Sequence, residues 1–134
     1  MDTERRSQRL FDQIIRNSIA RTLASNADVE SHLAWGLDEY FEMWGDGAFP
    51  WVDGGILTLH PNSVLNDEER QALAPLVEAL NAAWDETDGM SPDQFLQTKW
   101  PSRITSLAAR AFAVMSARGR SSETAEEEEP SGQF

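Results

Sequence analysis

The sequence of 134 residues contains no cysteine. Disulfide bonds, a thiolate nucleophile and a cysteine-based metal site are therefore excluded. No apolar run approaches the ~18 residues that suggest a membrane span, and the N-terminal region has no apolar signal core, so we expect a cytoplasmic protein. A phosphate-binding loop, a Gly-x-Ser-x-Gly motif, an internal repeat and a sustained heptad are also missing. These absences make a binding protein a better expectation than an enzyme.

Positive charge is scarce, and the net charge is −12. Residues 25–99 carry fifteen acidic against two basic residues, whereas residues 1–24 and 100–120 are net basic. In one interpretation the basic and acidic elements neutralise one another within the fold, and their charged side chains, including the arginines of 1–24, lie on solvated faces. Most exposed ion pairs of this kind contribute ~0–1 kcal/mol each to stability. In the other, an acidic surface attracts a basic protein and repels nucleic acid and membranes. We expect neither nucleic acid nor a membrane as partner.

Apolar residues recur at helical spacing along most of the chain and predict five helices. Asn66 with Glu69, and Ser91 with Gln94, match the capping-box pattern at two helix starts. Pro75 interrupts its helix without changing the phase of the apolar stripe, so we predict one kinked helix there. The expected ranges are 3–24, 28–44, 66–87, 92–100 and 101–118.

Residues 45–60 break the helical pattern and are rich in glycine and aromatic residues. Asp53 and Gly54 favour a type I′ hairpin turn, and the segments 51–52 and 56–59 that flank them suit two short strands. An isolated hairpin is marginal in water. We therefore expect an aromatic clasp, either a β-hairpin or an irregular segment, that packs between the N-terminal and C-terminal helices.

The final residues, 120–134, are mainly Ser, Glu, Gly and Pro. A segment of this composition cannot bury an apolar core. We therefore predict a single, mostly α-helical domain over 1–119, followed by a disordered acidic tail over 120–134.

The candidate functional surface lies on the predicted helix 28–44. Its apolar stripe includes Leu33, Leu37 and Phe41, and Trp35 falls nearly opposite that stripe among acidic residues. Tryptophan is enriched at binding hot spots, and acids steer basic partners. The alternative is that the hairpin or another helix covers Trp35, because tryptophan is highly buried on average. The candidate partner-binding set is His32, Trp35, Asp38, Glu39, Glu42 and Asp46.

The expected function is a non-catalytic acidic protein-binding module, such as an immunity-protein-like or antitoxin-like neutraliser, or an adaptor. We expect no cofactor and no metal, because the Glu-x-x-His pattern of di-iron bundles and the spacing of a calcium loop are missing. Two alternatives stay open. One is a small helical enzyme or ligand-binding protein that uses carboxylates near the clasp, such as Asp46 and Asp53. The other is a homo-oligomeric structural protein, for example a homodimer.

Overall fold

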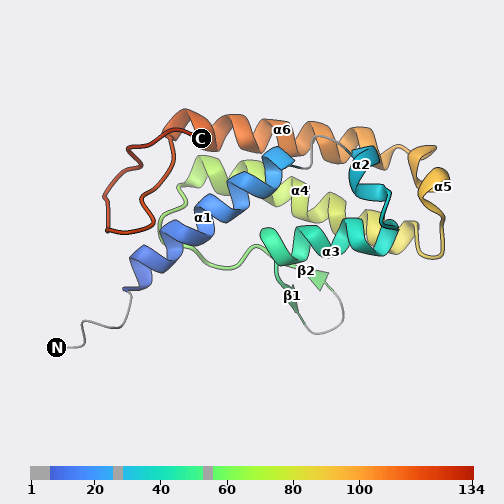
Figure 1. The fold of residues 1–134 in the computed structure, drawn as a ribbon, viewed down its shortest axis with the longest axis horizontal. Coiled ribbons are helices and arrows are strands. Elements are labelled where there is room, and N and C mark those ends of the chain that lie inside the picture. The colour runs from blue at the N-terminus through green and yellow to red at the C-terminus, as the bar shows by residue number, and fades with distance from the viewer. Residues whose placement is uncertain (1–6, 26–28, 53–55) are drawn as a thin grey trace.

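The computed structural model describes residues 7–25, 29–52 and 56–134, and the predicted mostly α fold is confirmed (Figure 1). One small antiparallel sheet accompanies the helices of the described residues. No helix in this part of the chain combines the length and apolarity needed to cross a bilayer. The elements in order are α1 (Gln8–Ser25), α2 (Val29–Leu33), α3 (Leu37–Gly47), β1 (Trp51–Val52), β2 (Ile56–Leu57), α4 (Asp67–Glu86), α5 (Pro92–Leu96) and α6 (Trp100–Arg118).

The predicted helix over 28–44 is interrupted, and α2 and α3 are separate helices. Gly36, which lies between them, has φ 110. Glycine adopts this left-handed backbone without the steric cost that a Cβ brings. The Gly36 N–H donates to the Leu33 carbonyl at 2.9 Å and closes α2 with a turn. The expected N-cap, Asp28, lies outside the described residues, as do residues 3–6 of the first predicted helix.

The local start signals are confirmed at α4 and α5. The Asn66 side chain accepts from the Glu69 N–H at 2.8 Å, and the Glu69 carboxylate accepts from the Asn66 N–H at 3.0 Å. Ser91 and Gln94 form the same reciprocal pair before α5. Helix α4 continues through Pro75 as one helix, as predicted. Helix α5 is shorter than expected and ends at Leu96; the Thr98 hydroxyl accepts from the Trp100 N–H at 3.2 Å where α6 begins.

The core lies where α4 packs along α6 and where α1 packs against both α6 and α3. Five fully buried aromatic residues lie along α3, just beyond its end and on α5. Phe41 is central among them, with its ring centroid 5.3 Å from Tyr40 and 6.0 Å from Phe95. Burying a large apolar side chain contributes roughly 1.5–3 kcal/mol, so this cluster fixes α3 against the rest of the fold. The five are Tyr40, Phe41, Trp44, Phe49 and Phe95.

The clasp contains the predicted hairpin, in which Trp51 pairs with Leu57 and Val52 with Ile56. The Asp53-Gly54 turn lies outside the described residues. The side-chain amide of Asn81, on α4, accepts from the Leu57 N–H and donates to the Leu57 carbonyl, both at 2.9 Å. The Trp51 ring packs on Trp84 with centroids 5.4 Å apart. The hairpin is therefore held on α4, consistent with the expectation that it needs helices for support.

Residues 120–134 differ from the predicted disordered tail. They form an ordered loop that returns along α1 (Figure 1). The backbones of Arg120 and Gly132 exchange two hydrogen bonds, of 3.0 and 2.9 Å, and close the loop. We call this segment the C-terminal loop.

Polar groups of α1 hold the C-terminal loop. Gln13 is almost fully buried, and its amide nitrogen donates to the carbonyls of Ser122 and Ala125, both at 2.9 Å. Its amide oxygen accepts from the Glu127 N–H at 2.8 Å. Hydrogen bonds between polar side chains of α1 and the loop backbone thus order a segment whose composition, poor in apolar residues, suggested disorder.

Candidate functional site

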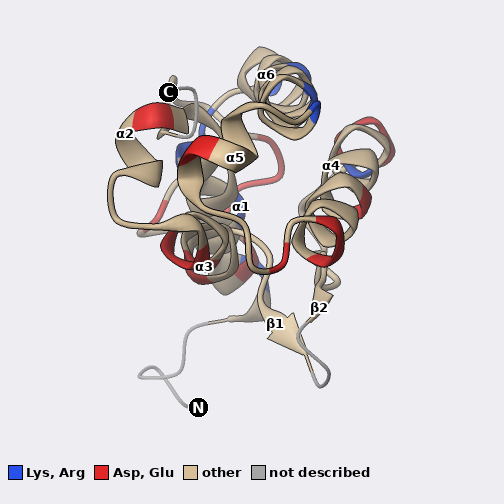
Figure 2. Ribbon diagram, turned by 90° about the vertical axis from the view of Figure 1, so that its right-hand side faces the viewer, with Lys and Arg blue, Asp and Glu red and all other residues tan. Residues whose placement is uncertain are grey.

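The six candidate residues come from two helices and the turn between them. His32 belongs to α2, Trp35 lies in the turn, and the four acids belong to α3. The continuous helix that grouped them in the sequence is therefore absent. Figure 2 shows acidic residues of α2, α3 and α4 at this end of the molecule, and basic residues on α6.

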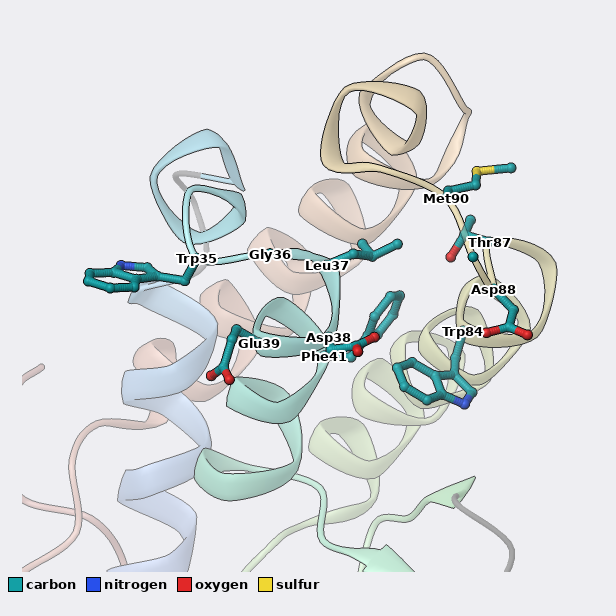
Figure 3. Close-up of a pocket in the computed structure, with 11 residues that line it drawn as sticks. Trp35, Gly36, Leu37, Asp38, Glu39, Phe41, Trp84, Thr87, Asp88 and Met90 are labelled. Atoms are coloured by element: carbon teal, nitrogen blue, oxygen red, sulfur yellow. The ribbon is translucent and has the colours of Figure 1, made fainter.

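Trp35 is 83% exposed. The turn at Gly36 projects its indole away from α3, as Figure 3 shows. Neither the described part of the hairpin nor another helix covers it, in contrast to the alternative that the sequence left open. By comparison, Trp44 is fully buried and Trp100 is 6% exposed.

Five of the six candidates line one groove of ≈ 420 Å³ between the end of α1, α2 and α3. We call it the Trp35 groove. Asp38 does not line it and faces the neighbouring pocket instead. Five residues that the sequence grouped therefore share one groove, although the continuous helix assumed for them is absent. The lining residues are Thr22, His32, Trp35, Glu39, Glu42, Met43, Asp46 and Gly47.

The acids of α3 repel one another. The charge of Glu39 is the main cause that raises the pKa of the Glu42 carboxyl above its usual value, with further contributions from desolvation, Asp46 and Asp38. None of these four acids takes part in an ion pair within the described residues. A positive charge placed beside them would relieve this repulsion.

His32 has a structural contact at the base of the groove. Its Nε2 lies 2.6 Å from the Ser25 carbonyl oxygen. A carbonyl can only accept, so the imidazole donates through Nε2 and ties α2 to the end of α1. Within 7–25, 29–52 and 56–134, no three His, Asp or Glu side chains gather as metal ligands. Asp46 lies on α3, and Asp53 lies outside the described residues, so the pair named for an enzyme cannot be placed.

A second pocket, of ≈ 490 Å³, opens between the start of α3 and the end of α4 (Figure 3). We call it the α3–α4 pocket. Phe41 and Trp84 form one wall, with ring centroids 5.2 Å apart at 80°. Asp38 lies on the α3 side and Asp88 on the α4 side. The full lining is Trp35, Gly36, Leu37, Asp38, Glu39, Phe41, Trp84, Thr87, Asp88, Gly89 and Met90.

Sequence reasoning missed Trp84 and Asp88 as members of this surface. Trp84 keeps the phase of the α4 core stripe and therefore resembles a core residue, yet it is only partly buried. Asp88 belongs to an acidic segment that the sequence suggests is a solvated helix end. The one signal in the sequence was that two acidic segments, 38–39 and 85–88, each stand near an aromatic residue of a core stripe.

Comparisons with protein-family models, with curated protein sequences and with solved structures found no match for this chain. The features of the molecule that bear on its function are therefore the geometry and charge of the two concave surfaces that meet at Trp35.

Proposed function

We propose that this protein is a non-catalytic module that binds a basic protein partner through the Trp35 groove. The observation that carries the proposal is the 83% exposure of Trp35 beside carboxylates that form no ion pair with any residue the structure describes. An immunity-protein-like or antitoxin-like neutraliser, or an adaptor, is the concrete form of this function. The partner is expected in the cytoplasm.

The exposed indole supplies affinity in this proposal. Trp35 contributes little to the core of the isolated protein, because its ring is in solvent. Covering it with a partner would remove apolar surface from water, at ~25 cal/mol per Å². Tryptophan is enriched among binding hot spots, where truncation costs roughly 2 kcal/mol or more of binding free energy.

The acids supply selectivity and steering. Glu39, Glu42 and Asp46 line the same groove as the indole, and the whole chain has a net charge of −12. Such a field attracts basic proteins and accelerates encounter at low salt. The same field disfavours nucleic acid and anionic lipid.

Trp35→Ala tests the proposal, with Phe11→Ala as the matched control because Phe11 is an exposed aromatic residue on α1. Both variants should melt within a few degrees of the parent. Each protein is then used to capture partners from native lysate at low and moderate salt, and the eluate is identified by mass. We expect a basic protein that the parent and Phe11→Ala retain and that Trp35→Ala loses. Equal capture by all three proteins would rule out the groove as the binding surface.

A self-associating protein would give a different result. If Trp35 is buried between two copies, sedimentation of the parent depends on concentration and Trp35→Ala abolishes that dependence. This outcome would replace the proposed partner by a second copy of the chain.

A further inference from the structure

We propose that the α3–α4 pocket receives one arginine side chain of the basic protein partner. The inference rests on the proposed function, because the arginine belongs to that partner. Trp35 and Glu39 line both this pocket and the Trp35 groove. One segment of a partner that covers Trp35 therefore reaches both surfaces.

The size of the pocket suits a side chain. Its volume of ≈ 490 Å³ lies within the range of roughly 300–1,000 Å³ that is typical of ligand sites. That volume exceeds the need of a bare cation and admits a long side chain with part of its backbone. The wall is also fixed, since Thr87 is buried and donates to the Ala83 carbonyl at 2.6 Å.

The charge of the lining selects a cation. The pocket is lined by Asp38, Glu39 and Asp88, and by no Lys, Arg or His. None of these carboxylates takes part in an ion pair in the part of the chain that the structure describes. An anion would be repelled, and an apolar group would desolvate the carboxylates without compensation.

The aromatic wall favours arginine over lysine. Phe41 is fully buried, and Trp84 is held between Phe41 and Trp51 with centroid distances of 5.2 and 5.4 Å. Aromatic ring faces attract cations. A guanidinium is planar and weakly hydrated, so it packs on the exposed part of the Trp84 ring and donates to carboxylates on more than one side, whereas an ammonium is a compact, strongly hydrated charge. Asp38 and Asp88, on opposite sides of the opening, provide those acceptors.

N-acetyl-arginine N-methylamide is the probe, with the corresponding lysine compound and the neutral citrulline compound as comparisons. The chain has five tryptophans, and each gives one indole N–H signal in a two-dimensional NMR spectrum. We expect the arginine compound to shift the Trp84 signal saturably and to leave the signal of the buried Trp44 in place. The lysine compound should bind more weakly, and the citrulline compound should cause no saturable shift. Equal binding of the arginine and citrulline compounds would overturn the inference.

Substitutions locate the bound cation. Asp38→Asn and Asp88→Asn should each weaken binding of the arginine compound by up to about fivefold, as expected for one exposed charge pair worth ~1 kcal/mol. Asp85→Asn is the matched control, because Asp85 is exposed near the same end of α4 but does not line the pocket. If Asp38→Asn and Asp88→Asn bind the compound no more weakly than Asp85→Asn, the pocket is not the site.

The failure of this inference can be told apart from failure of the proposed function. Glu42 and Asp46 line only the Trp35 groove, whereas Asp38 and Asp88 line only the α3–α4 pocket. In one outcome, Glu42→Gln and Asp46→Asn lose partner capture, but Asp38→Asn and Asp88→Asn still bind the arginine compound like the parent. This outcome overturns the inference and retains the proposed function. In the opposite outcome, Asp38→Asn and Asp88→Asn weaken binding of the arginine compound, but Trp35→Ala captures the partner as well as the parent does. This outcome supports the arginine pocket and overturns the proposed function.

Discussion

Arg16 and Glu69 form an ion pair of 2.6 Å in which neither side chain is exposed. Glu69 also accepts from Arg118 at 2.6 Å, and Arg16 donates to the Gly119 carbonyl at 2.7 Å. One carboxylate of α4 thereby joins α1, α6 and the start of the C-terminal loop. Desolvation offsets much of the attraction in such a network, but removing one member leaves uncompensated buried charge.

Glu69→Ala should therefore destabilise the protein by roughly 3–5 kcal/mol, the range for breaking a buried pair. Urea unfolding monitored by circular dichroism measures this. Asp67→Asn is the control, since the Asp67–Arg70 pair is exposed and should contribute less than about 1 kcal/mol. Equal costs for the two variants would show that Glu69 is not buried as described.

Deleting residues 121–134 should lower the melting temperature by several degrees. The deletion removes the partners of two buried polar side chains, Gln13 and Asn17. A buried polar group left without a partner costs ~1–3 kcal/mol. Deletion of residues 133–134 alone, beyond the pairing of Arg120 with Gly132, is the control; it removes the packing of Phe134 on Phe112 but leaves the partners of Gln13 and Asn17, and should lower the melting temperature less. A full deletion that melts like the parent would mean that the loop does not dock.

Tyr40 should make the protein sensitive to alkali. Burial raises the pKa of Tyr40 to about 12. The pKa of Tyr40 in the folded protein lies above the value near 10 in the unfolded chain. The contribution of Tyr40 to the free energy of unfolding is therefore complete below pH 10 and is lost as the pH rises through 12, a total of roughly 3 kcal/mol. Tyr40 is the only tyrosine, so tyrosinate absorbance reports this group alone. Tyr40→Phe should lose less stability between pH 10 and 12, and a free-tyrosine titration curve in the folded protein would contradict the burial.

Glu39→Gln should lower the pKa of the Glu42 carboxyl toward its ordinary value. Repulsion from Glu39 is the first cause of the raised pKa, and glutamine removes that charge while keeping the shape of the side chain. Carboxyl NMR titration of Glu42 in the two proteins measures the change. Because the pKa is raised, Glu42 loses its charge at a higher pH than an ordinary glutamate, so binding of a basic partner should begin to weaken there as pH falls. An unchanged pKa of Glu42 in Glu39→Gln would show that the charge of Glu39 does not act on the Glu42 carboxyl.

Elements with local signals could be predicted from the sequence. The capping box of Asn66 and Glu69 and the constant phase across Pro75 lie within one helix, and α4 is found as expected. The break at Gly36 was missed because a glycine inside a helical pattern is usually tolerated at a cost of ~1 kcal/mol. Three of the four acids of α3 nevertheless share one groove with Trp35, since short turns keep neighbouring residues close in space.

Features that depend on distant partners could not be predicted. Arg16 reads as part of a solvated arginine face, yet its carboxylate partner lies 53 residues away in the sequence. The C-terminal loop depends on Gln13, more than 100 residues earlier. In both cases polar side chains bond across the fold, and neither composition nor periodicity records which residues will meet.

The clamp between Asn81 and Leu57 also limits what the hairpin can associate with. Val52 and Ile56 are exposed apolar residues on that hairpin, and a bare strand edge with such residues is a template for pairing with another chain. The amide of Asn81 occupies both the donor and the acceptor of Leu57, which a third strand would need at this position. The side chain therefore ends the sheet at two strands on the β2 side and protects the protein from edge-to-edge aggregation there.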